Sequence, residues 1–158
     1  MKIKDEKTNV MRILEQKKVK YKSYNYLETG AISGMEVAKA LNEDPNLTFK
    51  TLVTIGKTNN HYVFLVPVNK ELDLKKASKA VNEKNIEMVK SKELLALTGY
   101  IHGGCSPVGM KKSFKTVIDS SAKNYDKLIF SGGKIGYQVE TTLDELKKVI
   151  DFDLKDIT

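Results

Sequence analysis

Apolar residues recur along the chain at two spacings, one typical of helices and one typical of strands. Val10, Ile13 and Leu14 follow the i, i+3, i+4 pattern of an amphipathic helix. Four more segments show this pattern behind a residue that favours a helix start: Ser33 before Val37, Ala40 and Leu41; Asp73 before Leu74, Ala77 and Val81; Ser91 before Leu94, Leu95 and Leu97; and Thr142 before Leu143, Leu146 and Ile150. Ser33 with Glu36, and Thr142 with Glu145, also have the spacing of a capping box. We therefore expect five helices, the last of which closes the chain.

The strand-like pattern is clearest in the middle of the chain. Residues 49–55 and 62–68 are rich in β-branched and aromatic side chains, and the polar turn 57–60 joins them, so they predict a hairpin. Shorter strands are expected at 116–119, 127–130 and 137–140. Because strands occur both in a hairpin and after helices, the sheet should be mixed and the fold α/β (α+β). The sequence shows no repeat, low-complexity tract or linker, so we expect a single domain over residues 1–158.

The charge balance narrows the class of partner. Of 158 residues, 27 are Lys or Arg and 20 are Asp or Glu, which gives a net charge of +7. A basic surface attracts polyanions, and this attraction weakens as the salt concentration rises. Nucleic acid is the partner we expect, while an anionic membrane or an acidic protein also fits the charge.

Cysteine content and hydropathy indicate a compartment. Cys105 is the only cysteine, so no internal disulfide can form, as is usual in a reducing cytosol. The first residues lack the apolar run of a signal peptide, and no stretch reaches the roughly 20 apolar residues of a membrane-spanning helix. The sequence therefore favours a cytoplasmic protein with no membrane partner.

Three segments hold residues that could carry chemistry: FKTL at 49–52, GGCSPVGMKK at 103–112 and SGGKIG at 131–136. Lys50 stands inside an otherwise apolar strand, where its charge is costly unless it meets an anion or reaches water. It is either an anion-binding group or an edge-strand lysine that discourages pairing with other chains. The glycine-rich segments can present main-chain N–H groups to a developing oxyanion, but each could equally be an ordinary turn.

Other chemistries fit the sequence less well. His102 and Cys105 could form a dyad, but no third group orients the pair, and a lone cysteine is more often a packing residue. Two histidines and one cysteine are too few for a zinc site of nitrogen and sulfur ligands, so we expect no metal. No phosphate-binding or serine-hydrolase motif is present, and we expect no cofactor. Residues 133–136 match the GxxG of KH-type RNA binders, but strand-like segments flank them.

Taken in order along the chain, these segments resemble the YbaK/EbsC family, relatives of the editing domain inserted in bacterial prolyl-tRNA synthetases. The resemblance covers nearly the whole chain and depends on FKTL combined with GGxSPxGxKK, together with a tyrosine-bearing strand, DPN, LDLKKASKAV, TVID and SGGK. It implies an aminoacyl-tRNA deacylase with a mixed, partly barrel-like sheet flanked by helices.

The resemblance also implies roles for individual residues. Lys50 would be the essential lysine that anchors the terminal phosphate or ribose of tRNA, and Gly103 would direct its amide at the ester carbonyl. The residues expected to bind substrate are Tyr26, Thr51, Gly104, Ser106, Pro107, Ser131, Gly132 and Gly133. Tyr24 is close enough in sequence to replace Tyr26 in this assignment. Ser33 stands where some members have an aromatic residue, and Cys105 occupies a variable position of the loop.

The reaction implied by the resemblance is removal of cysteine from tRNA(Pro), or from Cys-tRNA(Cys), with water or the substrate's own thiol as nucleophile. Lys111, Lys112 and Lys115 follow the glycine loop and would contact tRNA phosphates, or form a solvated basic face. Aminoacyl-tRNA is the expected partner, with prolyl-tRNA synthetase as a second candidate. Two alternatives stay open: a deacylase for another amino acid, such as alanine on tRNA(Pro), and a non-catalytic tRNA-binding module.

Overall fold

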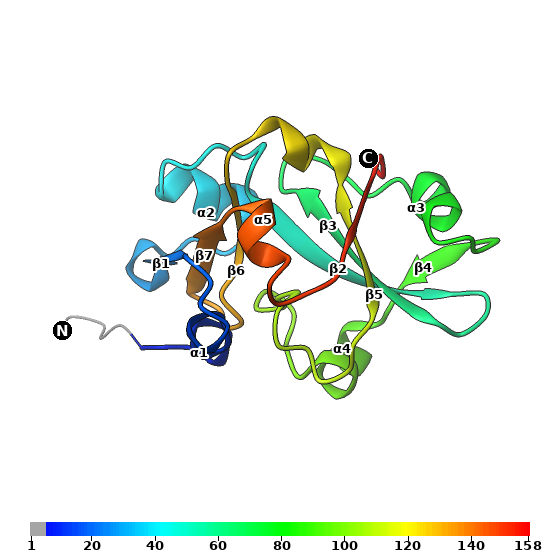
Figure 1. Cartoon of the computed structure of the whole chain (residues 1–158), viewed down its shortest axis with the longest axis horizontal. Helices are drawn as coiled ribbons and strands as arrows, with labels where there is room; N and C mark the ends of the chain where they lie inside the picture. The colour runs from blue at the N-terminus through cyan, green and yellow to red at the C-terminus, as the bar shows by residue number, and fades with distance from the viewer. Residues whose placement is uncertain (1–5) are drawn as a thin grey trace.

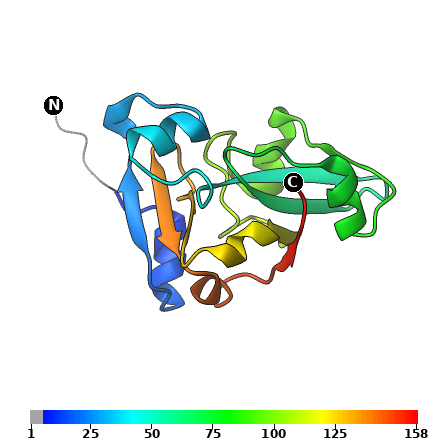
Figure 2. The same cartoon turned by 90° about the horizontal axis from the view of Figure 1, so that it is seen from above.

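The computed structural model describes residues 6–158, which form two β-sheets with helices packed around them (Figure 1, Figure 2). The smaller, antiparallel sheet has the strand order β1 (Lys22–Asn25), β7 (Tyr137–Thr141) and β6 (Leu128–Ser131). The larger sheet has the order β4 (Ile86–Met88), β2 (Phe49–Gly56), β3 (His61–Pro67), β5 (Lys115–Asp119) and β8 (Asp153–Lys155). The β2–β3 pair is the expected hairpin, while β5 is parallel to β3 and β8, so the predicted mixed α+β fold is confirmed.

The two sheets touch at one end of β2. An isolated bridge pairs Thr48 with Ile129 of β6, and the N–H of Ile129 donates to the carbonyl of Leu47 at 2.9 Å. The sheets meet at this bridge and do not close into a barrel. The bridge places β6 and β7 beside the first residues of β2, which is where Lys50 lies.

Local capping chemistry explains most helix starts. The described residues contain α1 (Asn9–Gln16), α2 (Gly34–Ala40), α3 (Leu74–Ala80), α4 (Ser91–Thr98) and α5 (Leu143–Leu146), with 3₁₀ turns η1 (Leu27–Thr29) and η2 (Ser120–Asn124). Ser33 and Glu36 form both arms of the predicted capping box, each at 3.1 Å, and Asp73 accepts two main-chain N–H bonds at the start of α3. The predicted apolar face of α1 is also confirmed, because Val10 and Leu14 are fully buried.

Two helix predictions were wrong in detail. The N-cap of α4 is Lys90 without a side-chain bond, and the predicted cap Ser91 is the first helical residue. The last helix stops at Leu146 and does not continue to Ile150. The Thr142 hydroxyl accepts from the Glu145 N–H, which is one arm of the predicted capping box. The other arm is missing, because the Glu145 carboxylate accepts from the N–H of Lys20, 125 residues away in the chain.

The chain closes with strand β8, which the sequence pattern did not reveal. Asp119, at the end of β5, is buried, and its Oδ1 accepts from the N–H of Ile157 at 3.1 Å while its Oδ2 accepts from the N–H of Ser121 at 3.3 Å. Ile157 is itself fully buried. One carboxylate therefore fastens the C-terminal segment and η2 to the larger sheet.

We predict that Asp119→Ala lowers the free energy of unfolding by about 1–3 kcal/mol, because it leaves buried main-chain N–H groups without acceptors. Urea denaturation followed by circular dichroism measures the change, with the exposed Asp126→Ala as the matched control. Equal unfolding free energies for the two variants would contradict the role of Asp119.

Candidate active site

A cavity of about 370 Å³ lies between residues of both sheets, the start of α2 and the glycine loop. Its walls include five of the ten residues expected to act in catalysis or substrate binding: Tyr26, Lys50, Thr51, Gly103 and Ser131. These come from segments that are far apart in the chain and meet because β6 and β7 pack beside the first half of β2. The volume falls within the roughly 300–1,000 Å³ typical of small-molecule sites.

Lys50 reaches the cavity from a strand with a neighbour on only one side at this point. β4 pairs with β2 at Thr54–Gly56 and no further, so at Lys50 the only ladder is the one to β3. The Lys50 side chain is 29% exposed, and its ammonium lies 3.4 Å from the Glu71 carboxylate, which is 92% exposed. Such a solvated ion pair stabilises little, so the ammonium can exchange Glu71 for an anionic ligand.

The open edge of β2 also leaves polar groups of Thr51 unpaired. The carbonyl of Val53 accepts from the N–H of Val89 on the side away from β3. Because alternate residues of a strand direct their main-chain groups to the same side, the N–H and C=O of Thr51 face this side too. Thr51 lines the cavity, and its hydroxyl oxygen is buried without a hydrogen-bond partner within residues 6–158. Groups of this kind are usually satisfied by a ligand or water.

The first glycine loop presents free amides at the cavity. Gly104 donates to the carbonyl of Ile101 at 3.0 Å, which closes a turn whose third residue, Gly103, has a φ of 91°. Within residues 6–158 the N–H groups of Gly103 and Cys105 have no acceptor. Glycine is required at 104 by a close approach, because a Cβ there would lie 3.1 Å from the main-chain nitrogen of Ile135. The two glycine segments therefore pack directly on one another.

Five of the expected substrate-binding residues lie outside the cavity wall, namely Gly104, Ser106, Pro107, Gly132 and Gly133. Ser106 is fully buried and its hydroxyl accepts from the N–H of Val108 at 3.3 Å. The N–H of Gly132 donates to the carbonyl of Tyr137, and that of Gly133 to the hydroxyl of Ser131. The amides of Gly104, Gly132 and Gly133 are engaged within the protein, so these glycines shape the loops. Ser131 is the member of its segment that lines the cavity.

The geometry distinguishes the two candidate tyrosines. Tyr26 is buried, lines the cavity, and donates its N–H to the carbonyl of Gly136 at 2.8 Å. Tyr24 lies outside the wall, and its hydroxyl donates to the Glu140 carboxylate at 2.9 Å. Ser33, at the start of α2, lines the cavity beside Ile32, where an aromatic residue was expected in some relatives.

The Cys105–His102 pair lacks the arrangement of a nucleophile and its base. Both residues line the cavity, but no hydrogen bond or ion pair joins them among the described residues. Burial raises the pKa of the Cys105 thiol to about 11, and a hydrogen bond with Thr98 only partly offsets this. The thiol is therefore protonated at neutral pH and is a poor nucleophile.

Metal and KH-type chemistry find no support in the described residues. Across residues 6–158 no three His, Cys, Asp or Glu side chains are grouped so that they could hold a metal ion. Residues 133–136 connect strands β6 and β7, whereas the KH motif joins two helices.

Sequence reasoning missed Gln138, which lines the cavity from β7 and is 7% exposed. Gln138 could have been noticed in the same way as Lys50, because each is a polar residue within an otherwise apolar strand. Met88, Val89 and Leu94 complete an apolar part of the wall that is assembled from β4 and α4. The sequence pattern did not reveal the three-residue strand β4.

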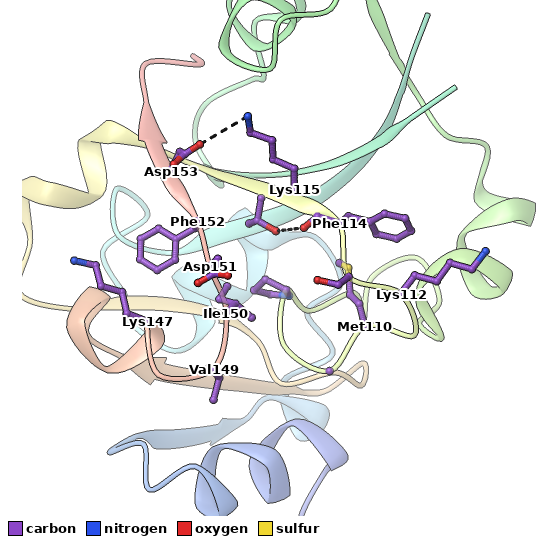
Figure 3. Close-up of a pocket in the computed structure, with 14 residues that line it drawn as sticks. Met110, Lys112, Phe114, Lys115, Lys147, Val149, Ile150, Asp151, Phe152 and Asp153 are labelled. Atoms are coloured by element: carbon purple, nitrogen blue, oxygen red, sulfur yellow. Dashed lines mark hydrogen bonds and ion pairs between the residues drawn. The ribbon is translucent and has the colours of Figure 1, made fainter. Parts of the chain in front are cut away.

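A second cavity, of about 730 Å³, shares no lining residue with the first. Pro107, from the glycine loop, lines it together with Lys112 and Lys115. Figure 3 shows Lys112 and Lys147 at opposite sides, with Ile150, Asp151 and Phe152 between them. Lys115 lies 4.0 Å from Asp153, and Lys111 is exposed outside this cavity. Two of the three lysines expected to contact tRNA thus line one groove.

Comparison with known proteins decides the family. A family model for the aminoacyl-tRNA editing domain matches residues 31–149, which contain β2, the glycine loop and Ser131. The chain belongs to the aminoacyl-tRNA editing domain family. The resemblance inferred from FKTL and GGCSPVGMKK is therefore confirmed.

Relatives in this family match over nearly the whole chain. A protein of Enterococcus faecalis, EbsC, named as a candidate Cys-tRNA(Pro)/Cys-tRNA(Cys) deacylase, is 43% identical over 97% of this chain and 94% of its own length. A solved structure described as a candidate trans-editing enzyme for prolyl-tRNA synthetase has a TM-score of 0.80 at 24% identity and covers 96% of this chain and 98% of its own. Another, of a hypothetical protein, has a TM-score of 0.81 at 19% identity over 92% and 98% of the two chains. These two structures support the fold. None of the helices within residues 6–158 is long and apolar enough to cross a lipid bilayer.

We predict that Cys105→Ala keeps deacylase activity within about threefold of the unmodified chain, because a thiol that stays protonated contributes little as a nucleophile. The measurement is the rate of amino-acid release at neutral pH, with circular dichroism to confirm folding. A loss as complete as that caused by Lys50→Ala would contradict this and would restore Cys105 as a catalytic residue.

Proposed function

We propose that this editing domain is a trans-editing deacylase that removes cysteine from misacylated tRNA(Pro), and from Cys-tRNA(Cys). The observation that carries the proposal is one cavity lined by both Lys50, whose ammonium pairs with an exposed carboxylate, and Gly103, whose N–H has no acceptor within residues 6–158. The name of its 43% identical relative supports the same substrate. The proposed enzyme acts as one domain over residues 1–158 and works in the cytoplasm, where tRNA is charged.

Each cavity group has a defined task in this proposal. The aminoacyl ester is already activated, so the enzyme mainly has to hold it and stabilise charge on its carbonyl oxygen. Lys50 anchors the terminal phosphate or ribose after leaving Glu71. The N–H of Gly103 donates to the ester carbonyl as negative charge develops there. Tyr26, Thr51 and Ser131 shape the pocket around the aminoacyl group.

The nucleophile in this proposal comes from the substrate. Attack of the cysteinyl thiol on its own ester carbonyl forms a sulfur–carbon bond and breaks the ester bond, and the thiol proton ends on the ribose oxygen that leaves. Water then opens the cyclic thioester and yields free cysteine. An intramolecular nucleophile can have an effective molarity of about 10⁵ M or more, which is consistent with a site built for positioning. A water molecule as the direct nucleophile would make the reaction a simple hydrolysis.

The tRNA body would lie along the groove of Lys112 and Lys115. Lys112 and Lys115 line the second cavity, on the far part of the loop that holds Gly103. Phosphates bound there would extend from an ester held in the first cavity. Prolyl-tRNA synthetase is a candidate partner, because a solved structure with this fold is described as a candidate trans-editing enzyme for that synthetase.

We predict that Lys50→Ala lowers kcat/KM for Cys-tRNA(Pro) by about 30- to 160-fold, as expected when one charge-assisted contact of about 2–3 kcal/mol is lost. The assay follows release of amino acid from cysteinyl-, alanyl- and prolyl-tRNA(Pro). Lys57→Ala, an exposed lysine in the β2–β3 turn, is the control.

The same assay separates the alternatives. No release from any substrate by the unmodified chain would favour the tRNA-binding module over the enzyme. Release of alanine alone would keep the reaction and change the substrate.

We also predict that the triple change of Lys111, Lys112 and Lys115 to Ala flattens the salt dependence of kcat/KM. Each lost phosphate contact should reduce the slope against log salt concentration by about 0.7–0.9. The control is Lys75, Lys79 and Lys84 to Ala, three exposed lysines on and after α3 that line neither cavity. Equal slopes for the two triple variants would assign the loop lysines to a solvated face.

A further inference from the structure

A carboxylate outside the cavity wall holds one of the wall's side chains. Gln138 lines the cavity, whereas Glu43, which follows α2, does not. The Gln138 carboxamide is assigned with its nitrogen toward the Glu43 carboxylate, because its oxygen would otherwise face another acceptor. In this orientation Nε2 of Gln138 donates to Oε2 of Glu43 at 2.6 Å and to Oε1 at 3.1 Å. One hydrogen of the carboxamide nitrogen is then shared between the two carboxylate oxygens, and the carboxamide oxygen lies on the side away from Glu43.

The fold fixes both partners of this pair. Gln138 lies in the central strand of the smaller sheet, opposite Tyr24 on one side and the cavity residue Ser131 on the other. Glu43 is held by the end of α2, where its N–H donates to the carbonyl of Ala38 at 2.8 Å and Asn42 turns the chain with a φ of 55°. The pair therefore joins α2 to the strand that forms the back of the cavity.

The charges around Glu43 make this corner negative. Glu140 is the next residue but one along β7, on the same face as Gln138, and its carboxylate accepts from the Tyr24 hydroxyl at 2.9 Å and pairs with the Lys127 ammonium at 3.3 Å. Lys127 pairs with Glu140 and acts on Glu43 only through its charge, so two carboxylates stand against one ammonium here. A carboxamide oxygen backed by a net negative charge is better suited to a cationic donor than to an anionic or neutral one.

We propose that Glu43 is a positioning residue that holds the Gln138 carboxamide oxygen toward the cavity, where it accepts a hydrogen bond from the α-ammonium of the aminoacyl group. This inference rests on the proposed deacylase function, because it assigns the group that recognises the amino end of that substrate. Neither residue belongs to the FKTL, GGCSPVGMKK or SGGKIG segments.

The pair has a built-in dependence on pH. Burial raises the pKa of Glu43 to about 7, with the Glu140 charge adding to the rise, while the hydrogen bond from Gln138 and the charge of Lys127 oppose it. Above that pH the carboxylate only accepts, so the Gln138 nitrogen must face it. Below that pH the protonated acid can donate to the carboxamide oxygen, and the reversed orientation becomes available. The correctly oriented fraction of Gln138 therefore falls as the pH drops through about 7.

Glu43→Gln tests the proposal, because a carboxamide at position 43 carries no charge and can pair with Gln138 in either orientation at every pH. Equal populations of the two orientations would raise KM about twofold, and loss of the negative charge behind the carboxamide oxygen accounts for the rest of the expected change. The substrate amine titrates in the same range, so the quantity to compare is the ratio of KM between Glu43→Gln and the unmodified chain. We expect a ratio of about 10 at pH 8 and near one at pH 6, with kcat changed less than KM. The exposed Glu93→Gln on α4 is the matched control, with a ratio near one throughout. A Glu43→Gln ratio that is the same at both pH values would overturn the positioning role.

A substrate without the ammonium tests the ligand assignment. With N-acetylcysteinyl-tRNA the Glu43→Gln ratio should stay near one even at pH 8, because the amide nitrogen carries no charge. A ratio that remains about 10 would show that Gln138 contacts another group, such as a ribose hydroxyl, and would overturn the ammonium assignment.

A third measurement does not depend on activity. In ¹⁵N-labelled protein, the side-chain amide signal of Gln138, assigned by its loss in Gln138→Leu, should shift with a midpoint near pH 7 and should not shift in Glu43→Gln. A midpoint below about pH 5, or no titration, would contradict the coupling of the two residues. This titration is measured without substrate, so it tests the coupling of Glu43 and Gln138 independently of the deacylase assay.

Discussion

The site depends on an incomplete pairing of β2, the strand that carries Lys50. This strand has a neighbouring strand on both sides over only part of its length. β4 pairs with Thr54–Gly56 and ends, so the first half of β2 has one open side. A strand edge with unpaired N–H and C=O groups is normally a liability in water. Here it is enclosed by the start of α2, the glycine loop and β7, and becomes the polar wall of a cavity.

The two glycine segments follow from the same constraint. To enclose the open edge, the loop at 103 and the turn at 131–136 must approach each other at main-chain distance. A Cβ at Gly104 would lie 3.1 Å from the nitrogen of Ile135, and one at Gly133 would lie 2.5 Å from Val10 of α1. Most glycines of the motifs thus allow close packing. In the packed loop, the N–H of Gly103 has no protein acceptor within residues 6–158. A conformation fixed before substrate binds is what stabilisation of a developing charge requires.

Local rules predicted much of this structure, and long-range contacts explain what they did not predict. The capping box at Ser33, the cap at Asp73 and the β2–β3 hairpin are set by residues a few positions apart, and each is found where the sequence placed it. The second arm of the capping box at Thr142 is missing because Glu145 accepts from Lys20 instead, and the segment after β8 is held by a bond between Asp119 and Ile157. In the site, Lys50 and Gly103 were visible as exceptions to the local pattern. The contact between Glu43 and Gln138 was not visible, because it joins a helix end to a strand 95 positions later in the chain.

The central claim is that one ammonium and one unpaired amide converge on a single acyl linkage. A crystal structure with a non-hydrolysable analogue, in which an amide joins cysteine to the 3′ position of a terminal adenosine phosphate, tests this most directly. The account predicts the Lys50 ammonium within hydrogen-bond distance of the phosphate or ribose, and the Gly103 N–H within about 3 Å of the acyl oxygen. An analogue bound in the same cavity with its acyl oxygen directed away from Gly103, or bound in the groove of Lys112 and Lys115 alone, would contradict it.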